Sequence, residues 1–245
     1  MIKYNASEVR ITKMEPFMRI LSCIATLLLG VAGVFGQVKT AEKPISYKYS
    51  GSLQAVVVTT DNWDAIKGEA RLMQRSTVRS AWKQVGKSFP VVVGRTGLAW
   101  SIDARMKAET QPHKVEGDGK APAGILMLTS AFASAEQKIK LPFTLLKEST
   151  ECVDDVKSVH YNKIVDRFQV GLFDWNSSEK MLAVGPQYEL GIFVAHNSER
   201  RKGSGSCIFL HIWENSETGT AGCTAMDRTN MEKIFSWIDN EKKPF

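Results

Sequence analysis

The stretch SCIFLHIW at residues 206–213 has a clear strand pattern, and it runs into the polar loop ENSETGTAGC, which ends at Cys223. Side chains alternate between the two faces of a strand, so Cys207, Phe209 and His211 share one face. The isoleucines and the leucine between them take the opposite face. This segment therefore predicts a strand followed by a turn-rich loop that delivers Cys223 directly after a glycine.

Four further stretches have the same character, at residues 53–60, 89–100, 123–132 and 188–197. Each is short, rich in β-branched and aromatic residues, and bounded by Gly, Pro, Asn or Asp, which is typical of antiparallel β structure. Apolar runs such as VVV and GIFV have no polar face, so they predict strands buried within a sandwich or under a helix. The expected fold class is mainly β.

A helix is expected near the C-terminus, in TNMEKIFSWID at residues 229–239. Thr229 and Glu232 have the spacing of a capping box. The apolar residues that follow have helical spacing, which predicts an amphipathic helix packed on the sheet. A second, weaker helical turn is expected at residues 177–183. The apolar positions of the first helix are Met231, Ile234, Phe235 and Ile238.

The start of the chain has the parts of a secretory signal peptide, with Arg19 ahead of an apolar stretch at residues 20–35 and a polar shift after it. The stretch has 16 residues, fewer than the roughly 20 that cross a bilayer as a helix. Residues 1–36 are therefore expected to be a signal peptide, with Met14 or Met18 as equally good starts. An N-terminal anchor that stays uncleaved is the alternative.

No linker, repeat or charge block divides the rest of the chain, so residues 37–245 are expected to form one domain, exported to the periplasm or the cell-wall space. The formal charge is +6, and residues 1–36 hold four basic and two acidic side chains, which leaves +4 without them. Only residues 200–202 form a basic run. A nucleic-acid binder usually clusters its Lys and Arg, so that class is not expected.

The cysteines become informative once the protein is exported. Removing Cys23 with the signal peptide leaves Cys152, Cys207 and Cys223. An odd number in an oxidising compartment leaves at least one thiol unpaired. That thiol is either a buried, inert side chain or one that a reaction requires.

A histidine at the end of a strand can take the thiol proton of a cysteine on the following loop, and the resulting thiolate attacks a carbonyl carbon. His211 and Cys223 fit this arrangement. Gly222 permits a sharp turn that points the amides of Gly222, Cys223 and Thr224 at a developing oxyanion. The same spacing also fits a packed core histidine beside a buried, inert cysteine.

Four segments together resemble the L,D-transpeptidase catalytic domain, also called YkuD-like, in a divergent branch. They are HKVEGDGKAPAGIL, CVDDVKSVHYN, GSGSCIFLHIW and TAGCTAM. They occur in the family's order, with a Lys-x-Pro-x-Gly strand entry at residues 120–124, and the resemblance covers about residues 56–238. It implies a YkuD-like β-sandwich or mixed sheet with a C-terminal amphipathic helix.

The resemblance also implies an exported enzyme that acts on peptidoglycan stem peptides. Cys223 would attack the carbonyl of the third stem residue, expel the terminal D-alanine and hold the stem as a thioester, with His211 as the general base. An amine from a neighbouring stem would then form a 3-3 crosslink. A carboxypeptidase or endopeptidase, in which water resolves the thioester, and a wall-binding protein without turnover are the alternatives. No cofactor, metal, nucleic acid or membrane partner is expected, apart from an uncleaved N-terminal anchor.

This chain departs from the family pattern around the cysteine. Typical members have a Ser-like residue two positions before it and an Arg two positions after it, where this chain has Ala221 and Ala225. The family's Arg commonly helps to bind the stem's carboxylate, so its absence puts donor identity and transpeptidation in question. Arg228 and Arg201 are candidate replacements for that cation.

Parity and export lead to the hypothesis that Cys152 pairs with Cys207, which leaves Cys223 free for chemistry. The competing hypothesis makes Cys207 the nucleophile, but its place within an apolar strand argues against it because reactive thiols need exposure and positive surroundings.

Other residues have both a functional and a structural interpretation. His196 is expected to orient His211 or line the cleft, or to be a bonded structural histidine. Trp213 and Ala221 are candidates for substrate binding, although core packing is the common role of Trp. Asp154 and Asp155 are candidates to bind substrate amines, or to cap backbone groups at a turn. The stretch GDGKAPAG lacks the Lys-Ser/Thr pair of a P-loop, so nucleotide binding is not expected.

Overall fold

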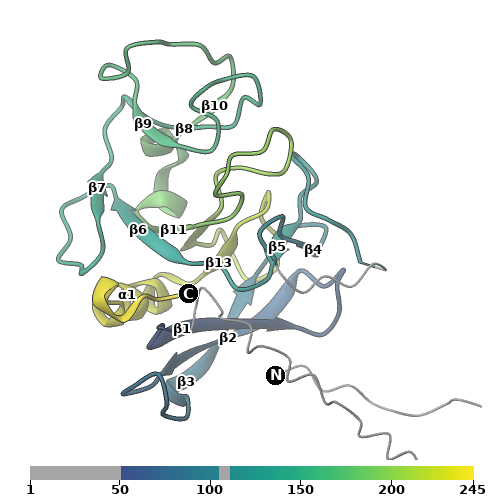
Figure 1. Cartoon of the computed structure of the whole chain (residues 1–245), viewed down its shortest axis with the longest axis vertical. Helices are drawn as coiled ribbons and strands as arrows, with labels where there is room; N and C mark the ends of the chain where they lie inside the picture. Colours follow the sequence, from purple (N-terminus) through teal and green to yellow (C-terminus); the bar gives the residue numbers. More distant parts are fainter. Residues whose placement is uncertain (1–50, 105–110) are drawn as a thin grey trace, which may run out of the picture. The chain divides into compact units, whose positions relative to one another are not determined.

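The strand expected at residues 206–213 is β12 (Phe209–Ile212), which lies inside an eight-stranded mixed sheet (Figure 1). This computed structural model describes residues 51–104 and 111–245. Strands predominate among them, so the expected mainly β fold class is confirmed. The described residues belong to one compact unit, and the proposed signal peptide at residues 1–36 lies outside them.

The large sheet has the strand order β1-β2-β3-β13-β12-β11-β6-β7, and two smaller sheets have the orders β10-β8-β9 and β4-β5. In Figure 1 the three-stranded sheet lies at the opposite end of the molecule from β1, β2 and β3. The other strands are β1 (Gln54–Thr60), β2 (Lys67–Gln74), β3 (Lys83–Val92), β4 (Leu98–Trp100), β5 (Ala121–Ala123), β6 (Leu128–Ala133), β7 (Phe143–Leu145), β8 (Thr150–Val153), β9 (Ile164–Asp166), β10 (Ser178–Lys180), β11 (Leu190–Val194) and β13 (Thr224–Met226).

The sheets are not antiparallel throughout, as the strand patterns alone suggested, because β12 pairs with β13 in parallel, as do β6 with β7 and β4 with β5. Parallel neighbours need a connection that returns the chain to the same end of the sheet. Residues 213–223 make that return between β12 and β13.

Two expected strands are interrupted. The stretch at residues 89–100 is split because Gly94 and Gly97 close a tight turn, in which the Gly97 amide donates to the Gly94 carbonyl at 2.8 Å. Gly97 has φ +87°, and a Cβ there would lie 2.0 Å from the carbonyl oxygen of Trp63, so only glycine fits. The stretch at residues 123–132 is divided between β5 and β6.

The two faces of β12 pack against different layers, as its alternating pattern predicts. The face with Leu210 packs against α1 (Arg228–Trp237), which Figure 1 shows beside the sheet. The face with Phe209 packs against η1 (Met181–Tyr188), a 3₁₀ helix, and against the half-cystine of β8. The α1 side chains buried there are Met231, Ile234 and Phe235, with Ile238 just beyond the helix.

Two helical expectations need correction. Helix α1 begins at Arg228, and its N-cap is Asp227, whose carboxylate accepts from the Asn230 amide at 2.8 Å. The expected Thr229 cap therefore lies inside the first turn. The helical turn expected at residues 177–183 is instead the edge strand β10 followed by the beginning of η1. A last short 3₁₀ helix is η2 (Asn240–Lys242).

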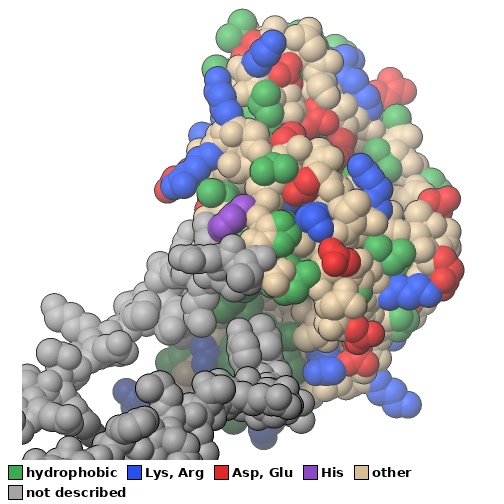
Figure 2. Space-filling view, turned by 90° about the vertical axis from the view of Figure 1, so that its right-hand side faces the viewer, with side chains coloured by type: hydrophobic (Ala, Val, Ile, Leu, Met, Phe, Trp, Pro, Cys, Tyr) green, Lys and Arg blue, Asp and Glu red, His purple; other side chains and the backbone are tan. Residues whose placement is uncertain are grey.

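Within the described residues, no helix has the length and apolar character needed to cross a membrane. Figure 2 shows Lys and Arg scattered among Asp and Glu over one face of the molecule, without a block of one sign on the described surface there.

Candidate active site

A cavity of about 380 Å³ brings together five of the residues that the sequence singles out: His211, Trp213, Ala221, Gly222 and Cys223. The loop between β12 and β13 forms one wall, and β3, β10 and η1 contribute others. Residues that are far apart in sequence thus share one concave site, which is the usual setting of an active site.

The parallel pairing of β12 and β13 decides where the cysteine lies. His211 is opposite Ala225, so Cys223, which precedes β13, lies beside Phe209 at the beginning of β12. The Phe209 amide donates to Cys223 Sγ at 3.3 Å, and the thiol donates to the Cys207 carbonyl at 3.5 Å. Phe209 and His211 share one face of the strand, about 7 Å apart along it. The thiol and the imidazole therefore border the same cavity.

The resting thiol of Cys223 is protonated. The side chain is buried, with 6% of its surface exposed. This burial raises the thiol pKa well above its usual value, and the negative charge of Glu179 acts in the same direction. The Phe209 amide and the positive charge of Lys114 oppose that shift. The thiolate expected from the sequence is therefore not the resting form.

His211 is held as a neutral imidazole. Its Nδ1 lies 2.8 Å from the carbonyl oxygen of Ile212. A carbonyl only accepts, so Nδ1 carries the proton and Nε2 keeps a lone pair. Burial lowers the His211 pKa to about 4, and its ring packs edge to face on Tyr188 with centroids 5.3 Å apart. Among the described residues no hydrogen bond joins the imidazole to Cys223, but the free Nε2 has the form a general base requires.

The candidate oxyanion hole has fewer donors than the three backbone amides expected from the sequence. The Gly222 amide donates to Thr220 Oγ1 at 3.1 Å, and that hydroxyl donates to the Cys223 carbonyl at 2.7 Å. Thr224 belongs to β13 and does not line the cavity. Of the three amides, that of Cys223 lines the cavity and has no acceptor within the described part of the chain. Thr220, which the sequence did not single out, thus fixes the shape of this turn.

A disulfide joins Cys152 to Cys207, with a Cα–Cα distance of 6.0 Å. This is the pairing that parity and export predict. It links β8 to the residues just before β12, and Cys223 is the free cysteine of the described residues. Cys207 therefore cannot serve as the nucleophile while this bond is intact.

His196 is not a cavity residue. Its Nδ1 lies 2.8 Å from Ser101 Oγ and its Nε2 lies 2.7 Å from the Ser204 carbonyl oxygen. Burial lowers its pKa to about 4, so it is neutral near pH 7. Both ring nitrogens are occupied, so of the two interpretations of His196 the geometry fits the bonded structural histidine and not a residue that binds substrate or orients His211.

The two arginines considered as the missing cation lie elsewhere. Arg201 pairs with Glu199 at 2.7 Å, Arg228 pairs with Glu189, and neither lines the cavity. Ala225 is fully buried within the sheet, so its position has no access to a substrate.

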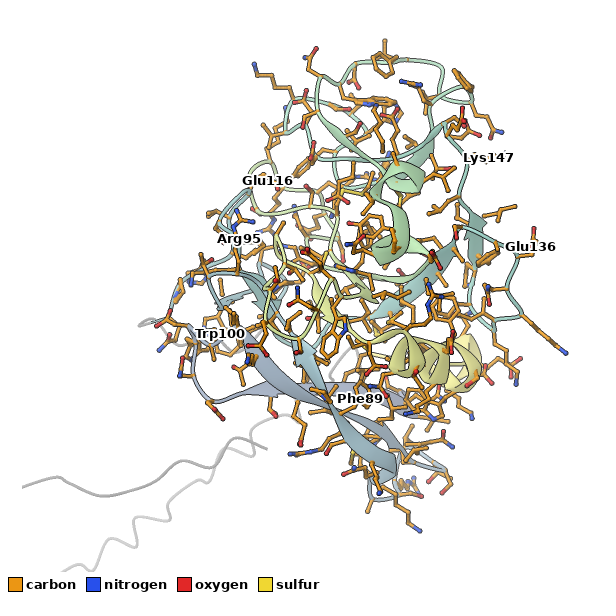
Figure 3. The ribbon with its side chains drawn as sticks, turned by 180° about the vertical axis from the view of Figure 1, so that it is seen from behind. Phe89, Arg95, Trp100, Glu116, Glu136 and Lys147 are labelled. Atoms are coloured by element: carbon orange, nitrogen blue, oxygen red, sulfur yellow. A yellow bond between two sulfur atoms is a disulfide. The ribbon has the colours of Figure 1, made fainter. Side chains whose placement is uncertain are left out.

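The cations that do line the cavity are Arg95 and Lys114. Figure 3 shows Arg95 and the cavity residue Glu116 at the same edge of the molecule. Lys114 lies in the segment HKVEGDGKAPAGIL, but nothing in its local pattern indicates that it approaches Cys223.

Among the described residues, four carboxylates also border the cavity: Glu116, Asp154, Glu179 and Glu214. Glu179 accepts from the Tyr188 hydroxyl at 2.5 Å, and burial raises its pKa to about 7. Glu116 accepts from Ser206 at 2.8 Å, and the buried Oδ1 of Asp154 has no hydrogen-bond partner in the described residues. Asp155, by contrast, accepts from two backbone amides and caps a turn.

No protein-family model, curated protein or solved structure matches this chain. The family resemblance therefore depends on the sequence segments and on the cavity. Within residues 51–104 and 111–245, no group of three His, Cys, Asp or Glu side chains is arranged to hold a metal ion.

Proposed function

We propose that this chain is an exported cysteine acyl-transferase that acts on peptidoglycan stem peptides, with a YkuD-like fold and L,D-transpeptidase activity. The observation that carries the proposal is a free thiol, Cys223, in the same cavity as His211, whose Nε2 is unprotonated. The disulfide between Cys152 and Cys207 supports export, because such bonds persist in oxidising compartments.

In the first half-reaction, Cys223 Sγ attacks the carbonyl carbon of the third stem residue while the thiol proton passes to His211 Nε2. The carbonyl π electrons move to oxygen, and the oxyanion accepts a hydrogen bond from the Cys223 amide. When the oxyanion collapses, the bond to the terminal D-alanine breaks. His211 returns the proton to the leaving amine, and the stem remains as a thioester on Cys223.

In the second half-reaction, the amine of a neighbouring stem attacks the thioester carbon and transfers its proton to His211. The carbon–sulfur bond breaks, and the proton returns to sulfur. One amide is lost and one is formed, so no oxidant, reductant or cofactor enters the balance. If water attacks in place of the amine, the same residues perform hydrolysis.

The neutral thiol and neutral imidazole suit an enzyme outside the cell. A thiolate is oxidised more readily than a thiol, so a buried and protonated Cys223 is protected until a substrate arrives. Deprotonation then takes place during the attack, with His211 as the base. The cavity also has both cations and carboxylates, which suits a peptide that bears carboxylate and ammonium groups.

The first experiment is acylation by a carbapenem, a β-lactam that mimics the donor bond. We expect intact-mass measurement to find one covalent adduct on the wild type and none on Cys223→Ser. His211→Gln keeps the cavity polar and is expected to slow the adduct by about a hundredfold or more, as loss of a general base does. A wild type that never forms the adduct contradicts the proposal.

The second experiment separates the three activities. Purified muropeptides incubated with wild type are expected to give crosslinked dimers. Trimmed monomers would instead assign the hydrolase, a carboxypeptidase or endopeptidase. No product, together with wall binding that is unchanged in Cys223→Ala, would assign a wall-binding protein without turnover.

A further inference from the structure

Lys114 is a buried lysine beside the candidate nucleophile, and the proposed mechanism does not yet use it. Only 3% of its side chain is exposed. Its Nζ lies 2.5 Å from Asp118 Oδ1 and donates to the Val115 carbonyl at 2.9 Å. An ammonium group has three N–H donors, so one remains for the cavity, which Lys114 lines together with Cys223.

The ammonium group approaches the turn that carries Cys223. A Cβ on Gly222 would lie 3.7 Å from Lys114 Nζ and 3.2 Å from the Lys120 carbonyl oxygen. The backbone at Gly222 therefore lies close to a fixed positive charge. The positive charge of Lys114 and the negative charge of Glu179 both act on the Cys223 thiol.

Neighbouring residues hold Lys114 in place. A Cβ on Gly205 would lie 3.1 Å from Lys114 Cε and 2.8 Å from His196 Nε2, so the lysine and histidine side chains both occupy the space beside this glycine. The Asp118 carboxylate that pairs with Lys114 also accepts from the amides of Val115 and Lys120 at 2.9 Å. This network fixes the ammonium group and shares the negative charge of Asp118 among several donors.

We propose that Lys114 stabilises the negative charge that forms first on Cys223 Sγ and then on the oxyanion, in place of the cation that this chain lacks after its cysteine. The inference deepens the proposed function and rests on it. Because the Gly222 amide is committed to Thr220, fewer backbone donors remain for the oxyanion than the three amides expected, with the Cys223 amide among those left without an acceptor in the described residues. A fixed cation next to this turn compensates for the missing donors.

The charged and titratable groups around Cys223 come from several elements. Glu179 faces it from β10, Tyr188 from η1 and His211 from β12, and each of them lines the same cavity. Tyr188 and His211 are neutral near pH 7, since burial raises the pKa of Tyr188 and lowers that of His211. Lys114 is thus the positive charge that opposes Glu179 at the thiol.

The alternative is a purely structural role, in which Lys114 only stabilises the loop through its hydrogen bonds to Asp118 and Val115. Alkylation of Cys223 by iodoacetamide across a pH series distinguishes the two roles, with the rate read by mass spectrometry of the Cys223 peptide. The variants are Lys114→Gln, which keeps a hydrogen-bond donor without the charge, and Lys114→Arg, which keeps the charge. Arg95→Gln is the matched control, because it neutralises an exposed cation of the same cavity.

A nearby cation lowers the pKa of a thiol by about one unit or more. Removing that cation leaves less thiolate, so we expect Lys114→Gln to slow Cys223 alkylation at pH 8 by about tenfold or more. Lys114→Arg should stay within about threefold of wild type, and Arg95→Gln within about twofold. Lys114→Met takes the place of Lys114→Gln if thermal unfolding shows that the latter is not folded.

If folded Lys114→Gln or Lys114→Met has the same alkylation rates across the pH series as wild type, the inference is overturned and Lys114 has only a structural role in the loop. Equal slowing by Arg95→Gln would overturn it as well, because the slowing would then reflect the total charge of the cavity and not a specific contribution of Lys114. The measurement needs no peptidoglycan. A wild type that is inactive on muropeptides but shows the Lys114 effect would therefore refute the proposed function and leave this charge assignment intact.

Discussion

Replacing both Cys152 and Cys207 by alanine is expected to lower the free energy of unfolding by about 4 kcal/mol. The disulfide closes a loop across a sequence separation of 55 residues. In the chain-entropy treatment, closing a loop of this length removes about 14 cal/mol/K from the unfolded chain, or about 4 kcal/mol at 25 °C. For a chain of this size that loss corresponds to a fall in Tm of about 8–16 °C.

The same change is expected to disturb the cavity, because the disulfide anchors the backbone next to the nucleophile. The carbonyl of Cys207 accepts the hydrogen bond of the Cys223 thiol, and Cys152 belongs to β8, which lies between β9 and β10. Carbapenem acylation of the double variant should therefore be slower than that of wild type, even at a temperature where both are folded.

The assays are urea unfolding, which gives the free energy, and thermal unfolding, which gives the Tm, both followed by tryptophan fluorescence. Wild type is compared with the double variant, and wild type is measured with and without reductant. Alkylation in denaturant without reductant, followed by peptide mapping, tests the connectivity. It should label Cys223 and leave the peptides of Cys152 and Cys207 linked. Labelling of both partners, or a Tm that changes by less than about 2 °C in the double variant, would refute the reasoning.

Three further outcomes are expected. The free energy of unfolding should fall as the pH drops from 6.5 to about 4, by up to about 3 kcal/mol for each of His196 and His211. In this pH range the two histidines bind protons in the unfolded chain but not in the folded one. Urea unfolding midpoints at pH 7.5 and 4.5 measure the loss. Glu179→Gln should speed alkylation of Cys223 by about three- to tenfold at pH 8 and change it little at pH 6, where wild-type Glu179 is already protonated; equal effects at both pH values would contradict this. Thr220→Val should slow carbapenem acylation by about ten- to a hundredfold, because the turn loses both hydrogen bonds that shape it, while a Tm close to that of wild type shows that the fold persists.

Part of the candidate site could be predicted from local pattern. The alternation in residues 206–213 places Phe209 and His211 on one face of a strand, and the structure has them on the face that borders the cavity. The odd number of cysteines, once export is assumed, requires one unpaired thiol, and Cys223 is the free cysteine of the described residues. Both inferences succeed because a strand repeats every two residues and because disulfides form in pairs.

The partners of these residues could not be predicted in this way. β13 has three residues, too few to show a period, so its parallel pairing with β12 was not foreseen. Thr220 and Lys114 have no local signature either, since their roles depend on hydrogen bonds and contacts formed only when the loop returns to the sheet. The structural role of His196 could not be read from local pattern either, because one of its two hydrogen-bond partners, Ser101, lies 95 residues away in the sequence.

The sequence by itself determined the mainly β class, the C-terminal amphipathic helix, and the candidate pair of His211 and Cys223, because periodicity, composition and cysteine parity are properties of a linear chain. Only the tertiary structure decided that both side chains are neutral at rest and that Lys114 and Glu179 bring opposite charges to the thiol. The physical reason is that protonation depends on burial and on charges brought close by folding, and neither can be read from spacing along the chain.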